Sequence, residues 1–359
     1  MVRATPKSGG KSAPVVLVTG ASGEIGRALL KALAGQPDQT PIVTVDAAPL
    51  RDDMRSLVAA SYLGDVSDRA VLDDIAATHD LDTIYHLAAL LSARGERHPE
   101  LAHRVNVEGT LNVLRTAHSE SYRKSRSLRV VFPSSIAVYG LPTRRGAQRA
   151  RSAPVREQQW NCPSTMYGCN KLYCEHLGRY YAFHAGEALA AGPRLDFRAL
   201  RLPGLLAADT LPSGGTSDFG SEILHAAARG VTYDCFVGAD ATLPFMAMPD
   251  AVRALIELAG AERTRLSSCV YNVSGFSVSA GAIAERVRKA FPGAKVSFAP
   301  DPQRAGIVAS WPETVDDRRA RADWGWKPTY DWERAFSEYL APGLFVRYGL
   351  VPKAGPDEK

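Results

Sequence analysis

The stretch "PVVLVTGASGEIG", residues 14–26, decides the fold class of this chain of 359 residues. Its first part is a run of aliphatic residues, typical of a strand that is buried on both faces of a parallel sheet. Its second part spaces Gly20, Gly23 and Gly26 over the turn into a helix-like stretch at 24–35. A glycine loop between a strand and a helix brings backbone N–H groups and the helix N-terminus close to a phosphate. The stretch therefore predicts a strand, turn and helix that bind a dinucleotide.

The next hundred residues alternate between strand-like and helix-like patterns. Further strand-like runs lie at 41–46, 82–90 and 128–135. The segment 99–119 has helical spacing, with apolar residues on more than one side. Such alternation predicts an α/β fold, a doubly wound parallel (Rossmann) sheet with helices on both faces. We expect this domain to occupy residues 14–203, after a disordered tail at 1–13.

The pattern becomes looser after residue 203. A turn-rich stretch at 211–220 is followed by shorter elements. Helix-like stretches are expected at 221–229, 249–259 and 279–290, and strands near 269–274 and 294–298. We interpret residues 204–345 mainly as a smaller mixed α/β substrate region, with some segments returning to the Rossmann domain. Residues 346–359 are expected to form a C-terminal tail.

Composition and charge exclude several classes of protein. Apolar residues make up 45% of the chain and charged residues 23%, as in ordinary globular proteins. No apolar run approaches the roughly 18 residues of a membrane span, so no membrane partner is expected. The net charge of +5 arises from basic residues in two short stretches, around 3–11 and 142–156, and the rest is nearly balanced. Nucleic acid is therefore not an expected partner, and 142–156 is interpreted as a solvated loop.

The cysteines and histidines show no pattern of a disulfide framework or a metal site. The five cysteines include no Cys-x-x-Cys pair, and the eight histidines lack zinc-site spacing. We therefore expect no metal, and a reducing compartment. That compartment would be the cytoplasm, or the mitochondrial matrix if the source is eukaryotic.

Acidic residues after the second and third strands refine the cofactor prediction. Asp46 ends the second strand, about 20 residues after Gly26, where an acid binds the ribose hydroxyls of NAD. The same carboxylate repels the 2′-phosphate of NADP, although Arg51 leaves NADP as an alternative. In "GDVSD" (64–68), Asp65 and Val66 are placed near the adenine. The alternative there is a helix cap formed by Asp65 or Ser67.

A tyrosine and a lysine lie four residues apart in "STMYGCNK", residues 164–171. On a helix this spacing puts Tyr167 and Lys171 on the same face. A nearby ammonium stabilises a phenolate, which makes the pair a candidate general base. The alternative is an ordinary solvated pair, because both residue types are common on helices.

The motifs together resemble those of the extended short-chain dehydrogenase/reductase family, over nearly the whole chain. The resemblance is carried by "TGASGEIG" (19–26), Asp46, "HLAAL" (86–90), "VNVEGT" (105–110), "SSIAVYG" (134–140) and "YGCNK" (167–171). Within the family, the chain is similar to the L-threonine 3-dehydrogenase branch. That likeness is carried by "LLSARGE" (90–96), "CPSTMYG" (162–168), "LRLPGLL" (200–206), "SGGTSDF" (213–219), "LPFMAMPDA" (243–251), "SWPETVDD" (310–317) and "DWGWKP" (323–328). The chain departs from the branch in its longer 142–156 loop and in Leu202, where an aromatic residue is common.

The resemblance implies an activity, NAD-dependent oxidation of the L-threonine 3-hydroxyl to 2-amino-3-oxobutyrate. Tyr167 would be the base, Lys171 would lower its pKa, and Ser135 would hydrogen-bond the substrate oxygen. The implied cofactor-binding residues are Gly20, Gly23, Glu24, Ile25, Gly26, Asp46, Asp65, Val66, Leu87, Ala88, Ala89, Asn106, Ser134, Tyr167, Lys171 and Pro203. The implied substrate-binding residues are Ser92, Ser135, Tyr167, Gly204, Gly215, Thr216, Asp218 and Trp311.

Several alternatives stay open from the sequence. Ser134 and Ser135 also fit a helix or turn cap, Asp218 a turn residue, and Trp311 a core tryptophan. The chain also fits an NAD-dependent sugar-nucleotide epimerase or dehydratase, or a dinucleotide sensor without catalysis. A homodimer paired through the helices at 99–119 and 163–185 is expected from the apolar sides of the first helix and from the family resemblance.

Overall fold

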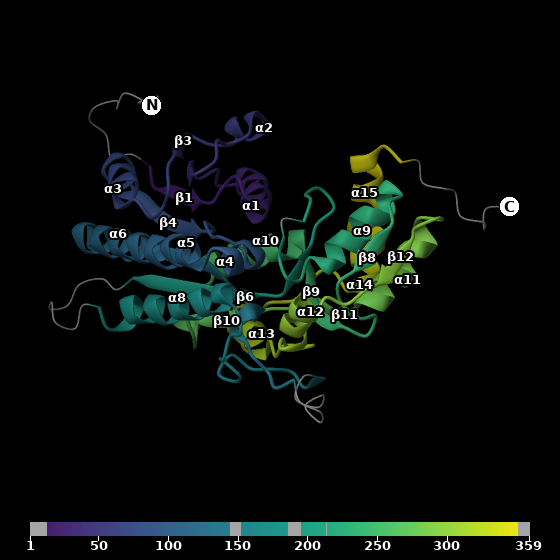
Figure 1. Cartoon of the computed structure of the whole chain (residues 1–359). Coiled ribbons are helices and arrows are strands. Elements are labelled where there is room, and N and C mark those ends of the chain that lie inside the picture. The colour runs from purple at the N-terminus through teal and green to yellow at the C-terminus, as the bar shows by residue number, and fades with distance from the viewer. Residues whose placement is uncertain (1–12, 144–151, 186–194, 213, 351–359) are drawn as a thin grey trace.

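The computed structural model describes residues 13–143, 152–185, 195–212 and 214–350 (Figure 1). Most of the expected tail at 1–13, the centre of the loop at 142–156, Ser213 and the end of the tail at 346–359 lie outside these ranges. None of the helices in the described ranges is long and apolar enough to cross a lipid bilayer.

The main sheet has seven strands in the order β10-β6-β5-β4-β1-β2-β3, and all its pairings are parallel. The doubly wound α/β fold class is therefore confirmed. The strand predicted at 269–274 joins the edge of this sheet, so the main unit includes residues from beyond 203. The strands are β1 (Val15–Thr19), β2 (Ile42–Asp46), β3 (Ala60–Leu63), β4 (Leu81–His86), β5 (Arg129–Ser135), β6 (Asp196–Leu202) and β10 (Val270–Asn272).

Helices cover both faces of the main sheet (Figure 1). A buried apolar cluster joins the sheet to the first set of helices, and a second cluster joins the opposite face to the other set. The first set is α3 (Arg69–Thr78), α5 (Pro99–His103), α6 (Gly109–Lys124) and α8 (Met166–Phe183). The second set is α1 (Glu24–Ala34), α10 (Met248–Gly260) and α13 (Arg318–Trp324), while the short α2 (Asp52–Arg55) and α4 (Ser92–Arg97) follow β2 and β4.

The prediction of one continuous α-helix at 99–119 is wrong in one detail, because the helix is interrupted. A π-helical turn, Arg104–Glu108, separates α5 from α6. At this turn the Asn106 carbonyl oxygen accepts from the Thr110 hydroxyl at 2.5 Å and from the Cys174 thiol at 3.3 Å. Side chains thus bond to a carbonyl within the helix, and such local rearrangements are frequent where helices carry function.

The remaining segments form a smaller unit with mixed strand directions. Figure 1 places α9, α11 and α15 together, away from the main sheet. A third apolar cluster fills this unit and extends to residues after β5. Its strands are β7 (Gly204–Leu206), β9 (Thr242–Ala247) and β11 (Phe276–Ser279) in one sheet, and β8 (Tyr233–Cys235) with β12 (Val296–Phe298) in another. Its helices are α9 (Phe219–Arg229), α11 (Ala280–Ala290), α12 (Pro302–Ala309), α14 (Trp332–Arg334), a π-helical turn (Ala335–Leu340) and α15 (Ala341–Tyr348).

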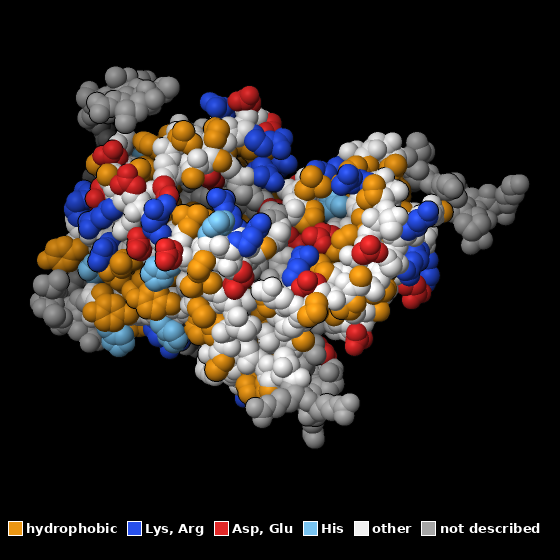
Figure 2. Space-filling view, viewed as in Figure 1, with side chains coloured by type: hydrophobic (Ala, Val, Ile, Leu, Met, Phe, Trp, Pro, Cys, Tyr) orange, Lys and Arg blue, Asp and Glu red, His pale blue; other side chains and the backbone are white. Residues whose placement is uncertain are grey.

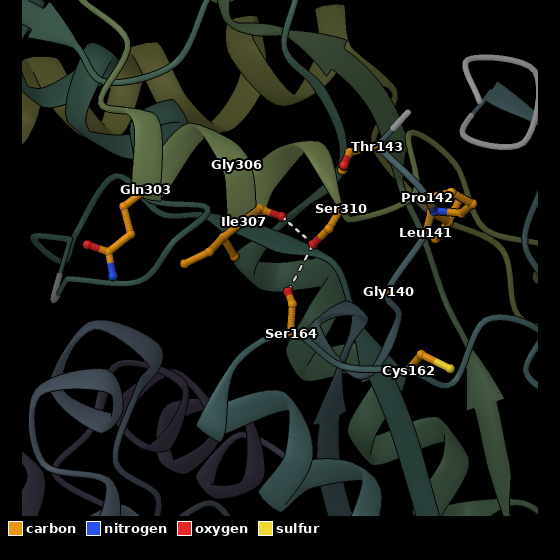
Figure 3. A pocket seen from close by; sticks show the side chains of 10 residues that line it. All are labelled: Gly140, Leu141, Pro142, Thr143, Cys162, Ser164, Gln303, Gly306, Ile307 and Ser310. Atoms are coloured by element: carbon orange, nitrogen blue, oxygen red, sulfur yellow. Dashed lines mark hydrogen bonds between the residues drawn. The ribbon is translucent and has the colours of Figure 1, made fainter. Parts of the chain in front are cut away.

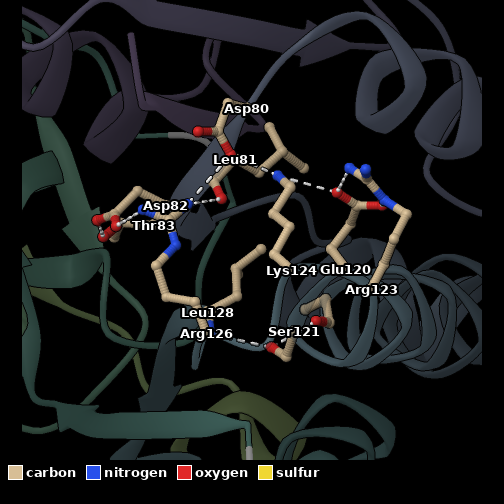
Figure 4. A network of polar contacts seen from close by, with 11 residues as sticks. Asp80, Leu81, Asp82, Thr83, Glu120, Ser121, Arg123, Lys124, Arg126 and Leu128 are labelled. Atoms are coloured by element: carbon tan, nitrogen blue, oxygen red, sulfur yellow. Dashed lines mark hydrogen bonds and ion pairs between the residues drawn. The ribbon is translucent and has the colours of Figure 1, made fainter. Parts of the chain in front are cut away.

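An ion network lies at the amino edge of the main sheet, where β4 and β5 begin (Figure 4). Lys124 Nζ lies 2.6 Å from Asp80 and 2.9 Å from Glu120. Arg126 lies 3.1 Å from both Asp80 and Asp82. The network ties the end of α6 to the strand ends. We call Asp80, Asp82, Glu120, Arg123, Lys124 and Arg126 the amino-edge network.

Candidate active site

The glycine loop between β1 and α1 is held tightly against the strand ends. Gly20 has a φ of 69°, and a Cβ on it would lie 2.5 Å from the Ala88 backbone nitrogen. A Cβ on Gly26 would lie 2.4 Å from the Gly20 carbonyl oxygen. Both positions therefore require glycine, because an L side chain would meet backbone that has no room to move.

This loop fits the pyrophosphate of a dinucleotide. Gly23 is the N-cap residue of α1, and no side chain caps this helix. The first backbone N–H groups of α1 therefore have no side-chain acceptor and can bind a phosphate. Glu24, in the first turn, is bonded to the Thr210 hydroxyl, and burial together with Asp218 and Asp209 raises the pKa of its carboxyl. Ile25 packs partly buried on the second apolar cluster.

Asp46 lies at the end of β2 beside the glycine loop. Its carboxylate oxygens accept from the backbone N–H groups of Ser22 and Ala48, each at 2.8 Å. These bonds fix the acid where the sequence places the adenosine ribose. Arg51 makes two hydrogen bonds to Asp53, at 3.0 and 3.1 Å, so its guanidinium is paired with a neighbouring acid.

The alternative role for Asp65 or Ser67, a helix cap, is not what the structure contains. The cap of α3 is Asp68, whose carboxylate accepts from the Ala70 N–H. Asp65 makes a tight turn instead, accepting from the Ser67 N–H at 2.8 Å. Val66, between them, is buried and its carbonyl accepts from Asn112 on α6.

The loop after β4 crosses directly over the glycine loop. The Leu87 N–H donates to the Thr19 carbonyl at 3.1 Å, and the Ala88 N–H donates to the Thr19 hydroxyl at 3.2 Å. Ala89 follows, and both the N–H and the carbonyl of Leu90 bond to the Asn106 side chain, at 2.7 and 3.1 Å. The Asn106 amide thus holds this loop in place.

His86 lies buried beneath this loop as a neutral side chain. Its Nδ1 lies 2.7 Å from the Thr19 hydroxyl, and its Nε2 lies 3.0 Å from the Thr110 hydroxyl. Burial, and to a lesser degree the charge of Lys171, lower its pKa to about 3. His86 therefore acts as a fixed connector between β1, β4 and α6.

Ser134 and Ser135 end β5 and have different partners. The Ser134 hydroxyl is buried and donates to Glu175 on α8 at 2.5 Å. The Ser135 hydroxyl accepts from the Ala137 N–H at 3.1 Å and caps a short 3₁₀ turn, Ile136–Val138. The cap suggested for this serine pair is therefore present at Ser135. A hydroxyl that accepts one bond still has its own proton to donate.

Tyr167 and Lys171 lie on one face of α8, as their spacing predicts. The helix begins at Met166, after Thr165 caps it by accepting from the Gly168 N–H. Lys171 Nζ lies 5.6 Å from the centroid of the Tyr167 ring and donates to the Pro133 carbonyl at 2.7 Å. Burial raises the pKa of the Tyr167 phenol, and burial lowers the pKa of Lys171 to about 8. In the protein alone, therefore, burial shifts the tyrosine pKa upward, against the direction that a general base requires.

Ser92 and Thr216 come together across the two units. The Ser92 hydroxyl, at the start of α4, accepts from both the N–H and the hydroxyl of Thr216 at 3.0 Å. Asp218 accepts from the N–H groups of Gly214 and Gly215, at 2.8 and 2.6 Å. Asp218 thus has the turn-forming role that the sequence left open, and it fixes the loop that carries Thr216.

Pro203, Gly204 and Trp311 complete the predicted set. Pro203 separates β6 from β7, and a Cβ on Gly204 would lie 2.6 Å from the Phe245 ring. Trp311 is 3% exposed and packs in the third apolar cluster, as a core tryptophan does. Its indole N–H is buried and has no hydrogen-bond partner among the described residues, which is also true of Trp324 and Trp326.

An open pocket of about 510 Å³ lies beside the beginning of α8 (Figure 3). It is formed by segment 140–143, segment 162–164 and helix α12. Figure 3 shows the Ser164 and Ser310 hydroxyls facing one another, 3.0 Å apart. None of the predicted site residues lines this pocket, but Ser310 precedes Trp311 in the chain. The described residues contain no group of three or more His, Cys, Asp or Glu side chains that could hold a metal ion.

Sequence reasoning missed Glu175, which is the partner of both Ser134 and Arg201. Glu175 is four residues beyond Lys171, as Lys171 is beyond Tyr167, so a signal was present. Three polar residues at a four-residue spacing share one face of a helix. Where that face is buried, its polar side chains need hydrogen-bond partners from other parts of the fold.

Comparison with known proteins agrees with this geometry. The model of the NAD dependent epimerase/dehydratase family matches residues 16–274, and the chain belongs to this family. The chain is 33% identical to the mitochondrial L-threonine 3-dehydrogenase of Bos taurus, over 88% of the chain and 79% of that protein. The structure of a GalE-like L-threonine dehydrogenase from Cupriavidus necator (holo form) is 36% identical, with a TM-score of 0.79, over 92% of the chain and 99% of that structure. A monomeric L-threonine 3-dehydrogenase from a metagenome database (apo form) is 32% identical over the same shares, also with a TM-score of 0.79. The extended short-chain dehydrogenase/reductase resemblance and an NAD(P) cofactor are confirmed by these findings.

Proposed function

We propose that this protein oxidises the 3-hydroxyl of L-threonine to 2-amino-3-oxobutyrate, with NAD as cofactor. The observation that carries the proposal is the placement of Tyr167 and Lys171 on one face of α8, beside the Ser134–Ser135 end of β5. The names of relatives at 32–36% identity support threonine as the substrate. Bound NAD⁺ supplies the hydride acceptor of the oxidation.

Tyr167 takes the proton of the substrate hydroxyl in this proposal. Ser135 donates to the same oxygen and holds it in line, while Lys171 stabilises the phenolate. Because burial raises the pKa of Tyr167 in the protein alone, we expect the reaction to be faster at alkaline than at neutral pH. The burial that disfavours the phenolate also excludes water, which strengthens the attraction of any nearby positive charge.

The substrate end of the site would be formed between Ser92 and the 214–218 loop. The Thr216 hydroxyl and the backbone of this loop are candidate partners of the substrate carboxylate. Asp218 would hold the loop, since its carboxylate is already bonded to Gly214 and Gly215. The unpartnered indole N–H of Trp311 is a further candidate donor to that carboxylate. In this proposal, residues 204–345 provide most of the substrate side, and Rossmann residues 14–203 provide most of the cofactor side.

An absorbance assay tests the proposal against its main alternative. Purified protein is incubated with NAD⁺ and L-threonine, and separately with UDP-galactose or UDP-glucose. We expect accumulation of NADH with threonine and no interconversion of the sugars. No NADH at saturating threonine would reject the proposal, and conversion of the sugars without net NADH would favour an epimerase.

We also propose that two copies of the chain pair through α6 and α8. Tyr122, Tyr173 and Tyr180 on these helices are 63%, 53% and 54% exposed, which is unusual for so many aromatic rings on one surface. Figure 2 shows hydrophobic and histidine side chains gathered over the same helices. A second copy of this chain is the partner that we propose for this surface. Pairing would bury the exposed tyrosines of α8, the helix that also carries Tyr167 and Lys171 in each copy.

Light scattering tests the pairing. Wild-type protein should have the mass of a dimer, and Tyr173→Glu with Tyr180→Glu should yield a monomer. Val346→Glu is the matched control, because Val346 is exposed on α15, away from α6 and α8. A wild-type monomer at all working concentrations would contradict the pairing, and a relative described as monomeric makes that outcome a real alternative.

A further inference from the structure

Three polar side chains lie on one face of α8 at four-residue intervals: Tyr167, Lys171 and Glu175. The second and third bond to consecutive residues of β5. Lys171 donates to the Pro133 carbonyl at 2.7 Å, and Glu175 accepts from the Ser134 hydroxyl at 2.5 Å. Two adjacent bonds therefore fix the face of α8 that carries Tyr167 against the end of β5.

Arg201 on β6 completes this contact. It lies directly opposite Ser134 in the sheet register, so both side chains leave the same face of the sheet. Its Nε and Nη2 donate to the two Glu175 oxygens at 2.9 and 2.6 Å. Its Nη1 donates to the Glu157 carbonyl at 2.8 Å and to Asn161 at 3.0 Å.

A contribution to folding stability does not explain why Glu175 and Arg201 form a buried ion pair here. Both side chains are 3% exposed, so both charges have lost their hydration. A buried ion pair of this kind is often no more stabilising than apolar side chains of similar volume. This pair, however, touches α8 and β5, which carry candidate active-site residues, and β6, which ends just before the candidate Pro203.

We propose that Glu175 is a positioning residue for the reaction. With Arg201, it holds the Tyr167–Lys171 face of α8 in register with the Ser134–Ser135 end of β5, and its negative charge acts on the Lys171 ammonium one helical turn away on the same face. The consequence for turnover rests on the proposed function, whereas the effect on the Lys171 charge does not.

The surroundings of Lys171 make Glu175 the group that matters for its charge. The groups facing Lys171 are His86 from β4, the Phe132 ring and Pro133 carbonyl from β5, and Tyr167, Cys174 and Glu175 from α8 itself. His86 is neutral, and burial raises the pKa of the Cys174 thiol to about 11 and that of the Tyr167 phenol. Among these groups, Glu175 is the carboxylate. Burial lowers the pKa of Lys171, and Cys174 and Glu175 oppose that shift.

The first test measures the Lys171 titration directly. Protein labelled with ¹³C at the lysine ε carbons is titrated by NMR, and the Lys171 signal is assigned by its loss in Lys171→Arg. In Glu175→Gln the Lys171 titration should move to lower pH than in the wild type. Glu157→Gln is the matched control, because Glu157 lines the same cavity but its carboxylate bonds to the Asn272 N–H and not to α8. An unchanged Lys171 titration in Glu175→Gln would overturn the electrostatic part.

The second test measures positioning. Glu175→Gln should lower kcat by on the order of 10²-fold with little change in KM for NAD⁺, whereas Glu157→Gln should keep its kcat. A cavity of about 250 Å³, lined by Glu175, Arg201 and Arg179 among others, reaches the pair. Acetate should therefore restore part of kcat to Glu175→Ala but not to the wild type.

The outcomes separate the two proposals. A kcat of Glu175→Gln equal to that of the wild type would overturn the positioning role. If the wild type itself produces no NADH from threonine, the proposed function fails, and the Lys171 titration still decides the electrostatic part. If Glu175→Ala does not fold, Glu175→Gln, which keeps the side-chain shape, provides the kinetic answer.

Discussion

The two edges of the main sheet treat charge in opposite ways. At the amino edge, Lys124 and Arg126 are paired with acids and partly exposed to water (Figure 4). The ion pair with Lys124 holds the pKa of Asp80 below its usual value. At the carboxyl edge, burial shifts pKa values toward the uncharged form: His86 to about 3, Lys171 to about 8, and Tyr167 upward.

This difference indicates which edge of the sheet is suited to proton transfer. The charged groups of the amino edge are matched to one another and can only add a little stability. The carboxyl edge holds Lys171, whose lowered pKa of about 8 lies near neutral pH, so a bound ligand can change its charge. The Glu175–Arg201 pair is the exception at this edge, because it keeps two opposite charges buried side by side.

The largest effect is expected from loss of one phenolic hydroxyl at the carboxyl edge. Tyr167→Phe should lower kcat for threonine oxidation by about 10²–10⁴-fold, since the general base is removed, while NAD⁺ binding is retained. Tyr62→Phe removes a hydroxyl that bonds to His79 near the amino edge and should leave kcat unchanged. Equal losses in the two variants, measured by NADH formation, would remove the distinction between the edges.

The second largest effect is expected on folding stability, when the buried Glu175–Arg201 pair is broken. Arg201→Met leaves Glu175 buried without its counter-charge and should lower the free energy of unfolding by about 3–5 kcal/mol. Urea denaturation of the variant and the wild type gives this difference. A change below that of an exposed pair, about 1 kcal/mol, would contradict the contrast drawn between the two edges.

Asp46 tests the carboxyl edge at the place where the cofactor is expected to bind. Asp46→Ala removes a carboxylate that is held by two backbone N–H groups and is expected to accept the ribose hydroxyls. Hydrogen bonds to a charged group contribute about 1.5–3 kcal/mol, so KM for NAD⁺ should rise by roughly 10–100-fold. The ratio of NADP⁺ to NAD⁺ use should rise as well. An unchanged KM for NAD⁺ would place the ribose elsewhere.

The smallest effect is expected at the amino edge. Asp80→Asn should lower the free energy of unfolding by less than about 1 kcal/mol at neutral pH, because the pair is partly exposed. The folded-state pKa of Asp80 lies below its unfolded value, so its contribution is present above that unfolded value and is lost as pH falls through the folded pKa. Urea denaturation at neutral and acid pH should therefore show the two proteins converging in acid. A difference that persists in acid would assign it to another cause.

Local patterns were enough to predict what lies along one segment of chain. The glycine loop, the acid at the end of β2 and the Tyr167–Lys171 face depend on short spacings, and the structure places them as those spacings require. The strand at 14–20 and the helix at 24–35 appear as β1 and α1 for the same reason.

Features that depend on distant partners could not be predicted. Ser134 meets Arg201 because β5 and β6 are neighbours in the sheet, which no local pattern states. At the π-helical turn Arg104–Glu108, the Asn106 carbonyl accepts from the Cys174 thiol, 68 residues away. The position of β10 at the sheet edge likewise follows from tertiary packing, since its sequence only indicates a strand.

The transfer of hydrogen from C3 of threonine tests the central claim most directly. Wild-type protein is given NAD⁺ and L-threonine that carries deuterium at C3, and the reduced cofactor is analysed by mass spectrometry. The account predicts reduced cofactor that contains the deuterium, and loss of this product in Tyr167→Phe. Reduced cofactor without deuterium, or deuterated product formed equally well by Tyr167→Phe, would contradict it.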